Sequence, residues 1–260
     1  MLSIVGVGYN VAGHVTPETL SLIDQADRLF YLVTDPATAS WLRSRHRAAT
    51  SLHDCYREGE RGLDASNAMV ERILRPLADG LDVCAAFSGH PAIGMHTSHE
   101  ALHRARAAGT RARMLPAVSF EDCLVADLGF DPGATGRMLY EATDFVTRPR
   151  PLDPGAALVL LQVGAVGERV YRPGAAPDGA GVRLLQEALA RHFPSEHELW
   201  LYERSPLPVA ESSVVRLPLA ELSRGPVRVN TTLYSPPLER RPRDPAVLER
   251  LGLAAPTESA

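Results

Sequence analysis

The feature that most constrains the fold is the alternation of short apolar runs with amphipathic stretches through the first 116 residues. The apolar runs predict strands at 2–7, 28–33, 81–87 and 111–115. Between them, N-capping residues and apolar residues at helical spacing predict helices at 16–26, 38–46, 64–78 and 97–108. Strands that alternate with helices in this way predict a parallel α/β sheet.

A glycine-rich loop, Gly6–Gly13, follows the first strand directly and precedes a helix. A strand, a GxG sequence and a helix also open dinucleotide-binding folds, but here the third glycine of that fingerprint is missing. Asp35 is the nearest acidic residue to the ribose position, and it precedes a proline in a turn. Two interpretations therefore stay open: a ligand-facing loop, or a tight turn between strand and helix.

Beyond Pro116 the pattern changes, because strands outnumber helices. Strands are predicted at 157–163, 198–202, 214–217 and 227–234, and helices at 119–128 and 181–193. This pattern favours a mixed sheet in a second domain. We expect two α/β domains, with a mainly parallel sheet at 1–118, a mixed sheet at 119–240, a ligand cleft between them and a surface tail at 241–260.

Composition excludes several kinds of chemistry. The sequence contains no lysine, so all 27 basic residues are arginine, which excludes lysine Schiff bases, pyridoxal-phosphate anchoring and a P-loop lysine. A net charge of −4 gives no reason to expect nucleic-acid binding. The three cysteines lie 29 and 39 residues apart, a spacing that fits neither a zinc knuckle nor a disulfide framework. There is no signal peptide and no apolar run of about 18 residues, so we expect a cytoplasmic protein that does not span a membrane.

The histidines divide into two groups. His96, His99 and His103 share one face of a predicted helix, but no suitably placed carboxylate accompanies them, so a solvated face is favoured and no metal site is predicted. His90 instead follows a strand, in a Gly-His-Pro turn at the edge where open α/β sheets bind ligands. It could contact a ligand or stabilise the turn. The residues alone therefore predict a cleft lined by 6–13, 88–91 and 116–119.

Several longer strings carry a family resemblance. They are Ile4-Val-Gly-Val-Gly8, Thr16-Pro-Glu-Thr-Leu20, Ala26-Asp27, Gly89-His-Pro91, Arg113-Met-Leu-Pro-Ala-Val-Ser119 and Leu160-Leu-Gln-Val-Gly164. In this order the chain resembles the tetrapyrrole methylases, a family of S-adenosylmethionine-dependent methyltransferases, over about residues 1–235. Within that family the runs 33–38, 114–128 and 140–145 resemble the borosin α-N-methyltransferases, which methylate backbone amides of a ribosomally made peptide.

The resemblance implies that S-adenosylmethionine lies folded between the two domains. It also implies that the glycine loop, with Gly8 and Tyr9, forms part of the acceptor pocket, and that the protein is a homodimer. The positions that match cofactor contacts are Ser88, His90, Ile93, Ser119, Phe120, Gln162 and Thr232.

The resemblance places catalysis in the segment before the helix at 64–78. Tyr56 matches a catalytic tyrosine, whereas His53 and Ser66 stand where further tyrosines are usual and Gly62 stands where an arginine is usual. Arg61 lies one residue earlier and could substitute. A backbone amide needs a base for its proton and a cation for the imidate charge, so Tyr56 is the expected base, Arg61 the cation and His53 a proton relay.

Two alternatives remain beside amide methylation. A methyltransferase of the same fold could act on a small molecule or on a more nucleophilic nitrogen or carbon, which needs less activation. A catalytically silent protein could bind cofactor or peptide without turnover. The sequence ends at Ala260 without a long extension that could carry a core peptide, so we expect the substrate peptide to be a separate polypeptide.

Overall fold

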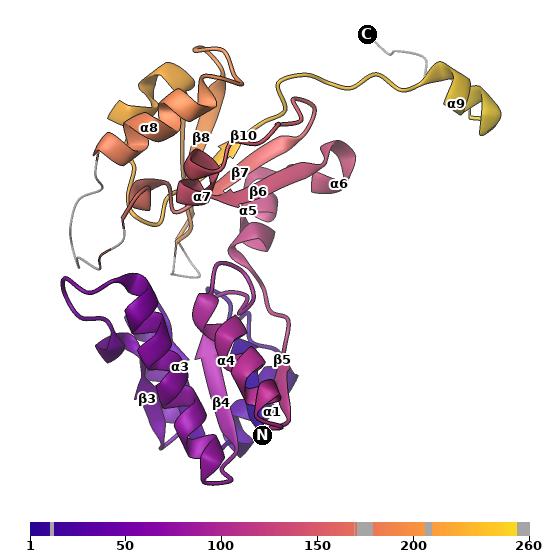
Figure 1. Ribbon diagram of the computed structural model, residues 1–260. Helices are drawn as coiled ribbons and strands as arrows, with labels where there is room; N and C mark the ends of the chain where they lie inside the picture. The colour runs from indigo at the N-terminus through magenta and orange to yellow at the C-terminus, as the bar shows by residue number, and fades with distance from the viewer. Residues whose placement is uncertain (11–12, 169, 171–178, 206–209, 254–260) are drawn as a thin grey trace.

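The computed structural model describes residues 1–10, 13–168, 170, 179–205 and 210–253. The chain forms two lobes, each built around one five-stranded sheet (Figure 1). The lobes are joined where the chain leaves β5 (Ala112–Met114) and enters α5 (Phe120–Leu128). This is the predicted arrangement of one parallel and one mixed sheet.

The first sheet is entirely parallel, with strand order β3-β2-β4-β1-β5. Three central strands, β1 (Leu2–Gly6), β2 (Arg28–Leu32) and β4 (Val83–Phe87), lie close to their predicted positions and are almost fully buried. The edge strand β3 (Ala49–Ser51) was not predicted. It has three small or polar residues, so no apolar run marks it.

Helices cover both faces of this sheet. On one face, α3 (Gly62–Ala78) and α4 (His96–Ala107) bury Met69, Ile73 and Ala101 against the strands. On the other, α1 (Pro17–Gln25) and α2 (Pro36–Arg45) bury Ile23 and Leu42. A strand buried on both faces needs a continuous apolar sequence, and for this reason the pattern could be recognised in the sequence.

The second sheet has the order β6-β7-β10-β8-β9 and is mixed. β6 (Arg137–Glu141) runs parallel to β7 (Ala157–Leu161), whereas β8 (Glu198–Glu203), β9 (Ser213–Pro218) and β10 (Thr232–Ser235) pair in antiparallel fashion. β6 was not predicted, and the strand expected at 227–234 is shorter. Residues 228–231 instead form a turn, closed by a 3.0 Å bond from the Thr231 N–H to the Arg228 carbonyl.

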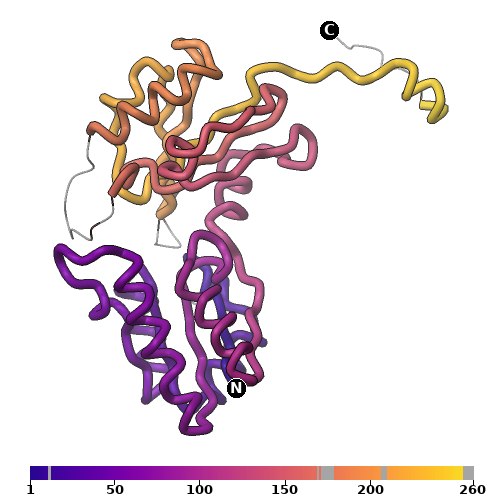
Figure 2. The backbone as a smooth tube through the Cα atoms, in the orientation of Figure 1, coloured from indigo at the N-terminus to yellow at the C-terminus, as the bar shows by residue number. Residues whose placement is uncertain are grey.

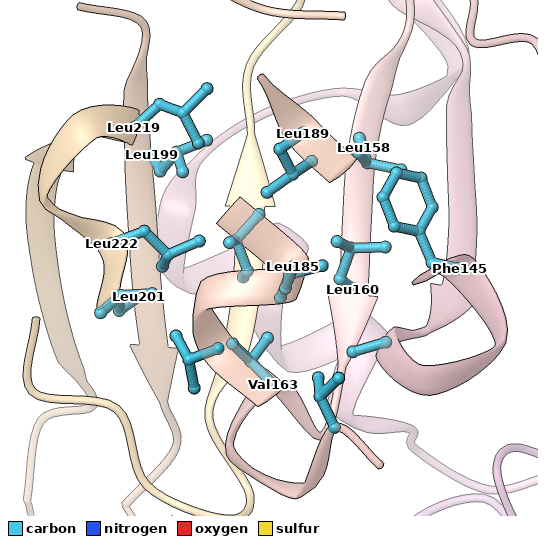
Figure 3. Packing of buried hydrophobic residues seen from close by; sticks show 14 of the residues in the cluster. Phe145, Leu158, Leu160, Val163, Leu185, Leu189, Leu199, Leu201, Leu219 and Leu222 are labelled. Atoms are coloured by element: carbon cyan, nitrogen blue, oxygen red, sulfur yellow. The ribbon is translucent and has the colours of Figure 1, made fainter. Parts of the chain in front are cut away.

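The second lobe has its main core on one face of this sheet. Figure 3 shows Leu185 and Leu189 of α8 (Gly179–Leu189) packing towards strand residues such as Leu160, Leu199 and Leu201. The short elements α7 (Ala142–Thr147), η2 (Val163–Ala165) and η3 (Leu219–Arg224) complete this core. α5 packs on the opposite face, and α6 (Pro132–Thr135) follows it.

The chain after β10 is held at the second lobe by contacts with Asp153 and Pro154. The Leu238 N–H donates to the Pro154 carbonyl at 2.8 Å, and Arg241 pairs with Asp153 at 2.6 Å. Beyond them, α9 (Pro245–Arg250) buries none of its residues and extends away from the lobe (Figure 2). Within the described ranges, no helix has the length and apolar character needed to cross a bilayer.

Candidate functional site

The glycine loop and the loop after β4 form one continuous surface. The Gly89 N–H donates to the Gly8 carbonyl at 2.9 Å, and both glycines have positive φ angles, 63° for Gly8 and 66° for Gly89. A Cβ on Gly89 would lie 2.5 Å from the Tyr9 hydroxyl oxygen, so Tyr9 needs a glycine there. The structure therefore brings Gly8 and Tyr9 together with the segment that carries Ser88 and His90.

The Tyr9 phenol is suited to donating a hydrogen bond. Burial raises the pKa of Tyr9 to about 12, helped by Cys123 and opposed by the nearby Arg204 cation. The Arg204 guanidinium carbon lies 5.9 Å from the centre of the Tyr9 ring. Tyr9 therefore keeps its proton at neutral pH.

The loop after β4 carries three of the predicted cofactor positions. The Ser88 hydroxyl accepts a bond from the Thr34 N–H at 3.0 Å, which ties the ends of β2 and β4 together. The His90 Nδ1 accepts from the Ala92 N–H at 3.1 Å, so neutral His90 carries its proton on Nε2. The Ile93 N–H donates to the His90 carbonyl at 3.2 Å and closes the turn. The turn role considered for His90 is present, and its Nε2–H remains as a donor.

Ser119 has a structural role that the sequence analysis did not identify. Its hydroxyl accepts from the Asp122 N–H at 3.1 Å, and Asp122 accepts from the Ser119 N–H and hydroxyl at 2.7 Å each. This capping box begins α5, and Phe120 packs behind it against the sheet. Any contact between Ser119 and a cofactor has to coexist with this cap.

Gln162 and Thr232 lie at the same end of the second sheet, because Gln162 follows β7 and Thr232 begins β10, the antiparallel neighbour of β7. Gln162 follows β7 in the left-handed conformation (φ 57°, ψ 43°), the one non-glycine residue with positive φ in the described parts of the chain. Its side chain is exposed. The Val163 N–H donates to the Thr231 carbonyl at 3.0 Å, which sets Gln162 beside the start of β10, where Thr232 is buried.

The predicted catalytic residues lie near the ends of β2 and β3. The His53 Nε2 is 2.7 Å from the Val33 carbonyl, and the His53 ring centre is 6.3 Å from that of Tyr56. Arg61 departs from the role expected of it, because its Nε and Nη2 bind Asp64 at 2.8 and 2.9 Å. The structure therefore brings His53 and Tyr56 together, while the Arg61 fork is occupied.

Sequence reasoning missed Arg204, which contacts Tyr9 from the other lobe. It directly follows β8, and a charged residue at the end of a buried strand was the available signal. The Ser66 position lies within α3. Among the described residues, no cluster of three or more histidines, cysteines or carboxylates is arranged to hold a metal ion.

A family model of the tetrapyrrole (corrin/porphyrin) methylases matches residues 1–222. The chain belongs to this family. It is thus a member of the S-adenosylmethionine-dependent methyltransferases, as the sequence resemblance implied. Two solved methyltransferase structures share its fold. The uroporphyrin-III C-methyltransferase of Thermus thermophilus is 19% identical with a TM-score of 0.65, covering 94% of this chain and 98% of that one. A cobalt-precorrin-4 methyltransferase is 16% identical with a TM-score of 0.63, covering 92% and 95%.

This methylase is more similar in sequence to proteins that combine a methyltransferase with a ribosomally synthesised peptide precursor in one chain. The omphalotin A protein of Omphalotus olearius is 37% identical over 97% of this chain and 61% of its own length. A type I borosin protein of Mycena rosella is 36% identical over 98% of this chain and 64% of its own length. The 260 residues thus span less than two thirds of these relatives.

The polar side chains of Gln162 and His90 can form the hydrogen bonds that S-adenosylmethionine requires. A Thermus thermophilus uroporphyrin-III C-methyltransferase in complex with S-adenosylhomocysteine is 17% identical, with a TM-score of 0.61 over 91% of this chain and 97% of that one. In the present chain the exposed Gln162 amide offers both a donor and an acceptor, which suits the edge of a purine ring. The His90 Nε2–H can donate to a carboxylate.

Proposed function

We propose that this methylase transfers methyl groups to backbone amide nitrogens of a ribosomally made peptide. The observation that carries the proposal is the 36–37% identity to fused methyltransferase and precursor proteins over almost the whole chain. We propose further that the peptide reaches the site as a separate polypeptide, and that the enzyme acts as a homodimer. The family resemblance supports the dimer, and light scattering tests it.

We propose that the cofactor lies between the two lobes. On the first lobe, the candidates for binding are Ser88, His90 and Ile93; on the second, Ser119, Phe120, Gln162 and Thr232. Three of these groups, Ser88, Ser119 and Thr232, are fixed by the fold, through strand ends, the capping box and β10. When bound, the cofactor supplies an electrophilic methyl group.

The chemistry required of this chain is activation of a poor nucleophile. A phenolate at Tyr56 accepts the amide proton, and the amide nitrogen then forms the new bond to the methyl carbon as the carbon–sulfur bond breaks. His53 can assist Tyr56, because a proton on Nε2 held by the Val33 carbonyl leaves Nδ1 as an acceptor. Gly8 and Tyr9 line the acceptor side.

Arg61 can hold the developing imidate charge only if its pair with Asp64 opens. Its side chain is 67% exposed, so the pair is held weakly and can be exchanged. The occupied fork also favours the second candidate function, transfer to a more nucleophilic acceptor that needs no strong cation.

The test combines the 260-residue protein, S-adenosylmethionine and synthetic peptides that correspond to open reading frames beside its gene. Tandem mass spectrometry then locates each added methyl group. Methylation on backbone nitrogens supports the proposal. Methylation only on side chains or on free small molecules supports the second candidate instead, and cofactor binding without any transfer supports a silent binding protein.

A further inference from the structure

Arg204 lies at the junction of the two lobes, and within the described ranges it has no anionic partner. Its Nη1 donates to the neighbouring Ser205 carbonyl at 2.9 Å, and its Nε is buried without a hydrogen-bond partner. Of the ion pairs formed between described residues, none includes Arg204. The four residues that follow Ser205 in the sequence, 206–209, include no acidic residue. A half-buried guanidinium that is left uncompensated costs free energy unless an anion arrives during function.

The groups around Arg204 come from both lobes. The Tyr9 ring is 5.9 Å from its guanidinium carbon. Burial and, second to it, the Arg204 cation lower the pKa of His14, which directly follows the glycine loop. At Cys123 of α5, burial raises the pKa of the thiol and the Arg204 cation opposes this rise. Arg204 therefore faces the glycine loop from across the lobe junction.

The structure also explains why Arg204 is directed there. The Tyr202 hydroxyl and the Ser212 hydroxyl both donate to one oxygen of Asp127, at 2.7 and 2.6 Å. Glu203 accepts from Thr231 at 2.7 Å. Tyr202 and Glu203 at the end of β8, and Ser212 just before β9, are thus all fixed to the second lobe.

The position of Arg204 complements that of Tyr56. In the first sheet β4 lies between β2 and β1, so the ends of β2 and β1 are about 10 Å apart at ordinary strand spacing. The His53 ring is hydrogen-bonded to the carbonyl of Val33, the residue after β2, and the Tyr56 ring lies next to it. Tyr9 instead follows β1. An acceptor amide bound above the end of β4 would thus have Tyr56 as a base on one side. On the other side it would have Tyr9 and Arg204 as hydrogen-bond donors.

We propose that Arg204 and the Tyr9 hydroxyl together stabilise the negative charge that develops on the carbonyl oxygen of the acceptor amide. This inference rests on the proposed amide methylation. Tyr56 phenolate takes the N–H proton, and the charge moves to the oxygen that Arg204 and Tyr9 hold. The nitrogen then forms the N–CH₃ bond, the S–CH₃ bond breaks with its electron pair left on sulfur, and the C=O bond returns to a neutral amide. Arg204 supplies the cation that is absent at Gly62.

Substitution of Arg204 tests the role directly. R204Q is expected to lower the single-turnover rate about 10²–10³-fold at saturating peptide and cofactor, the usual effect of losing one donor to an oxyanion. The single-turnover rate of R204K should lie between those of R204Q and the wild type, because lysine keeps the positive charge but lacks the planar guanidinium group. Affinity for S-adenosylhomocysteine, measured by calorimetry, should not change. The matched control is R216Q, since Arg216 stacks on Trp200 at 3.9 Å on exposed β9 and should keep the wild-type rate.

A second measurement does not depend on turnover. With 3-fluorotyrosine at position 9, R204Q should raise the midpoint of the fluorine NMR titration, because the nearby Arg204 cation favours the phenolate. An unchanged midpoint, or an R204Q rate equal to wild type, overturns the inference. So does a rate loss that only follows a loss of cofactor-product affinity. A wild-type protein that methylates no peptide refutes the proposed function itself, and is recognised before any variant is compared.

Discussion

Adding a single methyl group at Gly164 should disrupt the second lobe's side of the proposed cofactor site. A Cβ at this position would lie 2.3 Å from the Arg228 carbonyl oxygen and 2.8 Å from the Val229 nitrogen. Both are backbone atoms. The turn that holds them is closed by the Thr231 N–H, and the Thr231 carbonyl in turn accepts from Val163. No flexible side chain is therefore available to move aside.

The size of the effect follows from this geometry. Ordinary contact begins at 3.4 Å, so the 228–231 turn has to retreat by about 1 Å. Overpacking of this kind costs about 2–3 kcal/mol. For a cooperative unit of the size of the second lobe, that free energy lowers the melting temperature by roughly 6–18 °C. Because the same turn sets Gln162 beside Thr232, affinity for S-adenosylhomocysteine should also fall.

Scanning calorimetry of Gly164→Ala, with and without S-adenosylhomocysteine, measures both effects. Gly62→Ala is the matched control, because a Cβ there meets no atom within 4 Å and the φ angle suits any residue. The control should melt at or slightly above the wild-type temperature. A Gly164→Ala protein with wild-type melting and wild-type affinity would refute the packing argument.

Three further predictions concern the site. Tyr56→Phe removes only the hydroxyl, so the protein should fold normally while the single-turnover rate drops roughly 10²–10⁴-fold; an unchanged rate would move the assignment to His53. Arg61→Lys should lower the rate if Arg61 shares the imidate charge, and Asp64→Asn should then raise it by releasing the guanidinium fork; rates insensitive to both would leave Arg61 as a surface residue. Burial acts to raise the pKa of Asp122, but the two hydrogen bonds from Ser119, together with the nearby His90 and Arg137, outweigh it and hold that pKa below its usual value. The capping box thus stabilises the protein above the unfolded pKa, and this contribution is lost as the pH falls through the folded one. Ser119→Ala, which should cost about 1 kcal/mol at neutral pH, should therefore approach wild-type stability in acid when melting temperatures are compared.

The architecture could be predicted where burial leaves a clear pattern. β1, β2 and β4 are covered on both faces, so each must be apolar throughout, and each was found. The edge strands β3 and β6 escaped notice because one face or edge of each is open to solvent and polar residues are tolerated there. Their pairing depends on neighbours far away in the chain, which periodicity does not report.

The loops of the site could be predicted, but the partners of individual side chains could not. Glycines and a Gly-His-Pro turn after strands identified the edge of the sheet. That His53 binds the Val33 carbonyl, or that Arg61 is occupied by Asp64, depends on side-chain rotamers and on the course of the chain before α3. Arg204 comes from a strand in the other lobe, and only the tertiary structure brings it to Tyr9.

The hydrophobic clusters have a consequence for how this protein unfolds. Among the described residues, each cluster belongs to one sheet: two clusters lie on the first sheet and two on the second. With no shared core, the two lobes are coupled through few contacts and can lose structure as separate cooperative units. A ligand that contacts both lobes adds its binding free energy to their association. In the presence of such a ligand, the melting transitions of the two lobes should therefore move closer together. A single cooperative transition would then indicate that the ligand is bound between the lobes.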